Sequence, residues 1–154
     1  MRRAVALLLV AGLVGGGVAV GAVALLGEDD PYAGYCEVVT DNQAELTRIL
    51  DEGGPDVLLR ALPVFRELEE AAPSDIADDW QVVVTGLAAL ESALSAADVD
   101  PATYDPEDLP DDVSTAERDR IAAAAQKLTT DESVAAFAAV EQQARDVCQT
   151  PLRL

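Results

Sequence analysis

Apolar residues recur every three or four positions along much of this chain, and that spacing places them on one face of a helix. One series steps by 4, 3, 4, 3 and 4 positions and comprises Ile76, Trp80, Val83, Leu87, Leu90 and Leu94. Ser74 precedes this series and is expected to be the N-cap of its helix, because a serine side chain accepts a hydrogen bond from the first turn. The large ring of Trp80 is expected to pack in the core.

Two shorter series upstream predict two more helices. The first ends at Gly53-Gly54, a helix-terminating pair, and comprises Tyr35, Val39, Asn42, Leu46 and Ile49. Asn42 is its polar exception, interpreted either as a partly exposed position or as a polar device that fixes the helix register. The second series follows Pro55 and comprises Leu58, Leu62, Phe65 and Leu68. Pro63 lies inside it and is expected to kink or split the helix.

Two capping boxes predict the last two helices, because a Ser or Thr followed three residues later by Glu satisfies donors at a helix start. Ser114 and Glu117 form the first box, before Ile121, Ala124 and Leu128. Thr129 and Glu132 form the second, before Val134, Phe137, Val140, Ala144 and Val147. Aromatic residues make up only 4 % of the chain, and an aliphatic, alanine-rich core suits close-packed helices. The predicted fold is therefore all-α, with about five helices.

Residues 4–27 form an apolar segment without a charge, long enough to cross roughly 30 Å of hydrocarbon. Arg2 and Arg3 precede it and acidic residues follow it, so the N-terminus is expected in the cytoplasm and the rest outside. Two interpretations stay open. The segment either remains as a transmembrane anchor or is a signal peptide cleaved near Ala24, where Ala22-Val23-Ala24 offers a small-x-small site. A short acidic linker at residues 28–34 then leads to an extracytoplasmic domain at residues 35–154.

The two cysteines, Cys36 and Cys148, lie near the two ends of that domain. In an exported protein an even number of cysteines indicates a disulfide, and two residues allow a single connectivity. The chain has neither a CxxC motif nor a histidine to activate a thiolate, which argues against catalytic thiols. The disulfide also bears on topology. If short links reverse direction, closing the ring makes the third and fourth helices parallel, which predicts a long crossover at residues 98–113.

The net charge limits the classes of molecule that the domain is expected to bind. With 29 acidic and 10 basic residues the formal net charge is −19, so the domain is expected to repel nucleic acid and anionic lipid headgroups. The absence of histidine excludes Ser-His-Asp and Cys-His catalysis and every histidine-containing metal site. The sequence accordingly nominates no catalytic, cofactor-binding or metal-ligating residue, and it predicts no cofactor.

Two chemical alternatives remain for the acidic residues. A weak divalent-cation site is conceivable in the Pro- and Asp-rich loop, although its spacing fails the EF-hand pattern, and would use Asp98, Asp100, Asp105 and Asp108. A carboxylate-dependent hydrolase would need a pocket with two buried carboxyl groups of raised pKa. The simpler interpretation of both sets is a solvated acidic surface.

The pattern from Tyr35-Cys36 through the stretch Ala72-Pro73-Ser74-Asp75-Ile76-Ala77-Asp78-Asp79-Trp80 to Val147-Cys148 resembles uncharacterised small exported or membrane-anchored helical proteins of actinobacteria. This chain departs from lipid-anchored members in having no cysteine near the end of the apolar segment. The resemblance implies an exported helical domain and no activity. We expect a non-enzymatic extracytoplasmic domain, tethered to the membrane, that binds an unknown protein partner in the cell envelope or has a structural role there.

Overall fold

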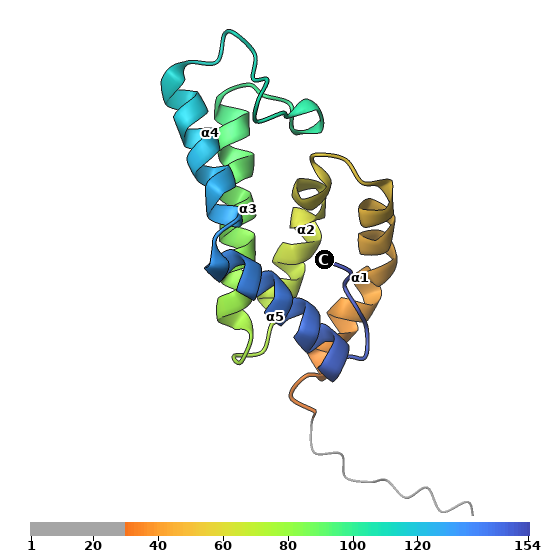
Figure 1. Cartoon of the computed structure of the whole chain (residues 1–154). Coiled ribbons are helices and arrows are strands. Elements are labelled where there is room, and N and C mark those ends of the chain that lie inside the picture. The colour runs from red at the N-terminus through yellow and green to blue at the C-terminus, as the bar shows by residue number, and fades with distance from the viewer. Residues whose placement is uncertain (1–29) are drawn as a thin grey trace, which may run out of the picture.

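The computed structural model describes residues 30–154, and in that range the chain is entirely helical, with no strand (Figure 1). Its elements are α1 (Ala33–Glu52), α2 (Val57–Ala71), α3 (Ala77–Ala96), the 3-10 turn η1 (Pro101–Thr103), α4 (Thr115–Leu128) and α5 (Asp131–Val147). The predicted all-α fold with five α-helices is confirmed. The first helix begins inside the predicted linker at residues 28–34, and the apolar segment at residues 4–27 lies outside the described residues.

Helices α1, α2 and α3 pack side by side in alternating directions, and α5 lies obliquely across them at the end where α1 begins (Figure 1). Their apolar faces form the larger of two hydrophobic cores. All six members of the series that predicted α3 are buried, and Trp80 is 0 % exposed. The indole N–H of Trp80 donates a hydrogen bond of 3.1 Å to the phenol oxygen of Tyr35, which is itself 2 % exposed. This bond ties α1 to α3 inside the core.

The predicted crossover at residues 98–113 is wrong, because α4 runs antiparallel to α3 (Figure 1). Gly86 of α3 lies against Leu128 of α4, whereas Ala93 of α3 lines a hollow together with Arg120. Higher residue numbers on α3 therefore meet lower numbers on α4. Residues 98–113 simply join the two helices at the end of the molecule farthest from the start of α1. The prediction assumed a reversal of direction at the short α4–α5 link, and the chain does not reverse there.

That link, at Thr129-Thr130, turns the chain sideways instead of back on itself, so α4 and α5 both run toward the end where α1 begins (Figure 1). Because α4 spans only part of the length of α3, α5 still reaches the start of α1. The predicted disulfide is confirmed, with 5.0 Å between the Cα atoms of Cys36 and Cys148, which are 112 residues apart. A disulfide of this span is thus compatible with an arrangement in which α1 to α4 alternate in direction, α5 continues obliquely and no crossover is needed.

The loop at residues 98–113 builds a second, smaller core over the distal end of the α3–α4 hairpin. Val99 and Val113 are buried there with Leu90, Leu94 and Ile121. Local hydrogen bonds fold the loop: carboxylate oxygens of Asp100 and Asp105 accept from the backbone two residues later, each at 2.9 Å. The guanidinium of Arg118 donates to the carbonyls of Val113, at 3.0 Å, and of Pro110. The loop is therefore folded and packed over the ends of α3 and α4, and it is not extended.

The helix starts agree with the predictions in one case of three. The Ser114–Glu117 capping box is present, and the backbone N–H of Ser114 donates to Glu117 at 2.9 Å. The predicted cap of α3 is wrong: Ile76 occupies the N-cap position without a side-chain bond, and Ser74 lies in the preceding turn. The cap of α5 is displaced by one residue, since Thr130 and not Thr129 accepts a hydrogen bond, from the N–H of Ser133 at 3.3 Å.

The structure also bears on three predictions about individual residues. Val134, predicted in the core, is 58 % exposed, because the buried face of α5 begins with Ser133 and Ala136 and meets the predicted series only at Val140 and Ala144. Pro63 does not split α2, which runs through it as a single helix. Asn42 is partly buried and donates hydrogen bonds of 3.1 Å to the carbonyl of Val38 and to Glu67 on α2, so it is a polar link between two helices.

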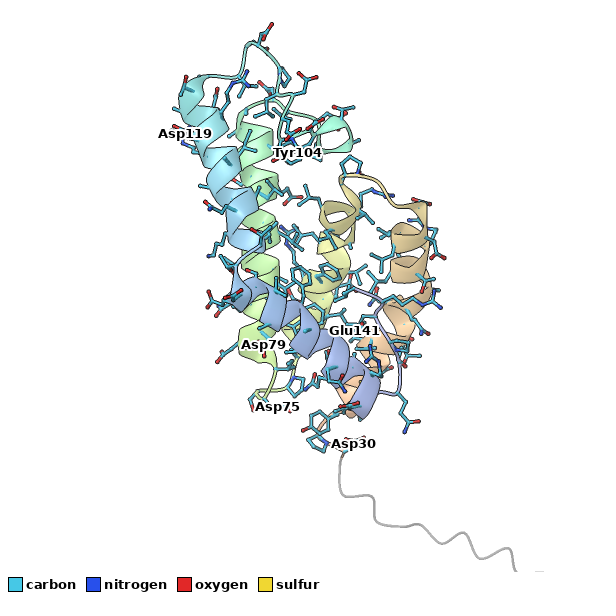
Figure 2. The ribbon with its side chains drawn as sticks, in the orientation of Figure 1. Asp30, Asp75, Asp79, Tyr104, Asp119 and Glu141 are labelled. Carbon is cyan, nitrogen blue, oxygen red and sulfur yellow. A yellow bond between two sulfur atoms is a disulfide. The ribbon has the colours of Figure 1, made fainter. Side chains whose placement is uncertain are left out.

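The packing of the C-terminal residues has no counterpart among the sequence predictions. The chain turns back after α5, and the Leu152 side chain, 2 % exposed, enters the larger core. The backbone N–H groups of Leu152 and Arg153 both donate to one carboxylate oxygen of Glu141, at 3.0 and 2.8 Å. Glu141 lies midway along α5 in Figure 2. The carboxylate of a helix residue thus fastens the chain end beside the disulfide.

Candidate interaction surface

The interior of the described range contains few polar side chains that could take part in catalysis. Among residues 30–154 the only buried polar residue is Ser133, and its hydroxyl donates to the carbonyl of Lys127 at 2.7 Å, a bond that shapes the α4–α5 turn. Glu69 is the one carboxyl group in that range with a resolved upward pKa shift, caused first by partial burial and then by the charge of Glu70. Glu69 lines none of the surface hollows described below. The two buried carboxyl groups that a hydrolase would need are not found in the described part of the chain.

The acidic loop likewise does not assemble a cation site. Of its candidate ligands, Asp100 and Asp105 each use a carboxylate oxygen to fold the backbone of the loop. Within residues 30–154 no three Asp, Glu or Cys side chains come together in an arrangement that could hold a metal ion. Asp98, Asp100, Asp105 and Asp108 therefore belong to the solvated surface of the loop.

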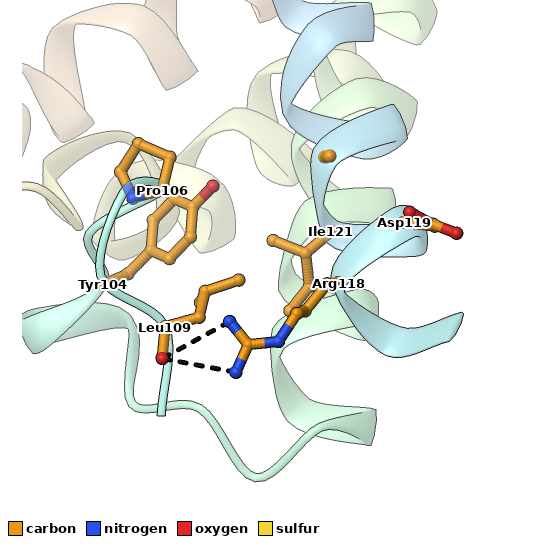
Figure 3. Close-up of a pocket in the computed structure, with 7 residues that line it drawn as sticks. Tyr104, Pro106, Leu109, Arg118, Asp119 and Ile121 are labelled. Atoms are coloured by element: carbon orange, nitrogen blue, oxygen red, sulfur yellow. Dashed lines mark hydrogen bonds between the residues drawn. The ribbon is translucent and has the colours of Figure 1, made fainter. Parts of the chain in front are cut away.

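A small hollow of about 210 Å³ lies beneath this loop, against the first turns of α4 (Figure 3). Its walls are mainly apolar and come from Tyr104, Pro106, Leu109, Ile121 and Ala122. The pKa of the Tyr104 phenol is raised, first by burial and then by the nearby charge of Asp105, so the phenol stays protonated. Arg118 is engaged with backbone carbonyls, and in Figure 3 the carboxylate of Asp119 points away from the hollow. The hollow is a gap under a folded loop, without a free charged group.

A larger depression follows the outer face of the α3–α4 hairpin. One open hollow of about 520 Å³ is lined by Ala89, Ser92, Ala93, Ala96, Arg120, Ala123 and Ala124. A second, of about 310 Å³, is lined by Gln81, Val82, Thr85 and Lys127. The α3 residues of the two sets continue one another at helical spacing, so both hollows belong to a single strip along α3 and α4. We call the residues of both sets the α3–α4 groove.

The composition of the α3–α4 groove is unusual for so acidic a protein. Its lining includes no carboxylate, and alanine makes up most of the larger hollow but none of the smaller one. Its two charged residues, Arg120 and Lys127, are both basic and exposed, and neither forms a salt bridge with any residue of the described range 30–154. By contrast, four other arginines in that range are each paired with a glutamate: Arg48, Arg60, Arg66 and Arg145.

Glu117, one turn earlier on α4, is influenced by the charge of Arg120. The pKa of Glu117 is lowered, first by hydrogen bonds from the hydroxyl and backbone N–H of Ser114 and to a lesser degree by Arg120. The Glu117 carboxylate is thus committed to the helix cap, with its oxygen 2.7 Å from the Ser114 hydroxyl. Arg120 and Lys127 remain positive charges beside an apolar floor.

Besides the acidic loop, a second group of carboxylates lies at the end of the molecule where α1 begins. Asp30 and Asp75 lie together near the start of α1, with Asp79 close by on α3 (Figure 2). Asp75 accepts hydrogen bonds from the phenol of Tyr32 at 3.2 Å and from the amide of Gln143 at 3.3 Å, and these bonds join α1, α5 and the turn before α3. The pKa of Tyr32 is raised by Asp75, through the hydrogen bond first and then through its charge. This end is therefore acidic and cross-linked, unlike the groove.

Comparisons with known proteins assign neither a family nor a function to this chain. No model of a known protein family matches this chain, and no curated protein or solved structure is significantly similar to it. In residues 30–154 no helix combines the length and apolarity required to span a bilayer. The sequence did not predict the α3–α4 groove. Its alanines and serine are visible in the sequence of α3, but recognising the groove required knowing which faces of α3 and α4 lie side by side.

Proposed function

We propose that this protein is a non-enzymatic domain, held outside the cytoplasmic membrane by residues 4–27, that binds a protein partner of the cell envelope through the α3–α4 groove. The observation that carries the proposal is the groove itself: an open apolar strip, free of carboxylates, on a protein with a net charge of −19. Apolar grooves on helical proteins are places where the apolar face of a partner helix docks.

Location outside the membrane is supported by two independent features. The disulfide between Cys36 and Cys148 fits an oxidising compartment, where such bonds persist. The charge pattern around residues 4–27, basic before and acidic after, favours translocation of the helical domain. The acidic end near Asp30 and Asp75 then faces the membrane, and the α3–α4 hairpin extends away from it. This location is also what the resemblance to exported actinobacterial proteins implies.

The location is tested by adding protease to intact spheroplasts that make the full chain. We expect digestion of the helical domain without lysis, and protection only of a short fragment from the N-terminus. N-terminal sequencing of the undigested protein distinguishes an anchor, which keeps Met1, from a signal peptide cleaved near Ala24. Protection of the whole domain until the membrane is broken would disprove the proposed orientation.

Binding through the groove is tested by photo-crosslinking in living cells. A benzoylphenylalanine placed at Ala89, in the groove, is compared with one at Ala44, an exposed alanine of α1. The proposal predicts a discrete crosslinked protein at position 89 and little or none at position 44. If position 89 yields no more product than position 44, the groove is not the binding surface.

A further inference from the structure

We infer that the α3–α4 groove receives an α-helix of the partner whose contact face combines small apolar residues with acidic side chains about seven residues apart. This inference rests on the proposed function and names the class of partner. It follows from three properties of the groove: its length and floor, the spacing of its two bases, and the charge of everything else that this chain offers as an occupant.

The length and floor of the groove fit a helix. From Gln81 to Ala96 the α3 side extends over about 22 Å, or roughly four helical turns. In the larger hollow the floor consists mainly of alanines and carries no bulky side chain to block close approach, and in the smaller one it is formed by Gln81, Val82 and Thr85. Helices dock into apolar grooves through anchors spaced three, four and seven residues apart, and small residues at the contact let the backbones come near. A strand would instead require an open sheet edge, and the described residues contain none.

The two bases set the chemistry of the flanks. Arg120 and Lys127 are seven residues apart, so they lie on the same side of α4 with a rise of about 10 Å between them. A partner helix that lies along the groove presents its own residues i and i+7 at the same separation. Acidic residues at those two positions therefore oppose both bases at once. The absence of carboxylates from the groove means that nothing in its lining would repel them.

A second copy of this chain fits less well. In a symmetric dimer across the groove each copy presents the same lining, which has no carboxylate to set against Arg120 and Lys127 of the other copy. The apolar segment at residues 4–27 of the same chain carries no acid either. Charge complementarity thus selects a different protein.

The test uses two synthetic peptides of about 20 residues that share an alanine and leucine face and differ only in their flanks. One carries Glu at positions i and i+7, and the other carries Lys there. Each is titrated with the full-length protein in lipid nanodiscs, and binding is followed by fluorescence anisotropy at low salt, where exposed charges are least screened. We expect the Glu peptide to bind roughly tenfold more tightly than the Lys peptide, a difference of about 1.4 kcal/mol, because exposed ion pairs contribute only modestly.

A charge-reversed variant, Arg120→Glu with Lys127→Glu, should invert this preference so that the Lys peptide binds more tightly. The matched control is Arg48→Glu with Arg145→Glu, which changes the net charge equally at exposed arginines of α1 and α5. The control should keep the wild-type preference for the Glu peptide. Far-UV circular dichroism and thermal melts of both variants confirm that each is folded, so that an inverted preference cannot be ascribed to unfolding.

Two results would overturn the inference. One is equal binding of the two peptides by the wild-type protein, and the other is an equal change of preference in the control variant. These outcomes differ from a failure of the proposed function. If position 89 crosslinks to a protein in cells but the contact segment is not an acidic helix, or is a second copy of this chain, the groove binds a partner and the inferred class is wrong. If position 89 captures nothing, both proposals fail.

Discussion

Replacing Tyr35 by Phe removes one oxygen atom and should nevertheless destabilise the protein measurably. That oxygen accepts the hydrogen bond of 3.1 Å from the indole N–H of Trp80, and the two side chains are 2 % and 0 % exposed. Tyr35→Phe leaves the indole N–H buried without an acceptor, because water cannot reach it. A buried donor that loses its partner costs about 1–3 kcal/mol, so we expect the free energy of unfolding to fall by about 2 kcal/mol.

The measurement is urea-induced unfolding at pH 7, followed by far-UV circular dichroism. Fluorescence of Trp80, the single tryptophan, serves as a local probe of the same site. The midpoint should fall while the slope with denaturant stays constant, since the surface exposed on unfolding hardly changes. Tyr32→Phe is the matched control. Its phenol also makes one hydrogen bond, to Asp75, but lies at the surface, where water replaces the lost partner.

The reasoning is refuted if Tyr35→Phe unfolds at the same urea concentration as the wild type, or if Tyr32→Phe is equally destabilising. A double-mutant cycle sharpens the test. Trp80→Phe removes the donor, so adding Tyr35→Phe to that variant should cost much less than it does in the wild type. An unchanged cost in the two backgrounds would place the effect in packing and not in the hydrogen bond.

Three further predictions concern the disulfide and the start of α4. Replacing Cys36 and Cys148 by Ser should lower the free energy of unfolding by about 4–5 kcal/mol, since the bond closes a ring of 112 residues, and urea titrations with and without reductant check this. Ser114→Ala should cost about 1 kcal/mol in thermal melts through loss of the cap, whereas Ser74→Ala, at a serine that caps no helix, should cost almost nothing. The cost of Ser114→Ala should also shrink in acid. The pKa of Glu117 is lowered in the folded state, so its carboxylate stabilises the fold fully above its unfolded pKa, and this stabilisation is lost as pH falls through the folded pKa. Urea titrations of both proteins at several pH values measure the change.

Each of the three has its own contrary outcome. If the Cys-to-Ser variant matches the wild type, residual structure in the unfolded chain already provides the constraint attributed to the disulfide. If the two serine variants are equally destabilised, side-chain capping does not explain the start of α4. If the cost of Ser114→Ala is the same at neutral and acidic pH, the ionised carboxylate of Glu117 contributes nothing to the cap.

Regular local patterns carried most of the fold prediction. The α3 series was correct at every member, because a helix with a wide buried face repeats its apolar residues faithfully. All six residues of the series, from Ile76 to Leu94, are buried. The α5 series was partly wrong because its buried face contains Ser133 and Ala136, small residues that carry little hydrophobic signal. Val134, the larger residue, drew the prediction to the wrong phase and is 58 % exposed. On α5 the prediction followed the larger apolar residues, whereas the close packing of the helix buries small ones.

By itself the sequence determined the features that depend on neighbours along the chain: the number of helices, the Ser114–Glu117 cap, and the pairing of two cysteines that had no other partner. It could not determine the direction of α4. That direction depends on the angle of the turn at Thr129-Thr130 and on the contact of Leu128 with Gly86, where a Cβ atom would approach the leucine to 2.8 Å. The α3–α4 groove has the same origin. Its residues lie on two helices, and only the antiparallel packing of these helices brings Ala89 and Ala93 beside Arg120, and Val82 beside Lys127.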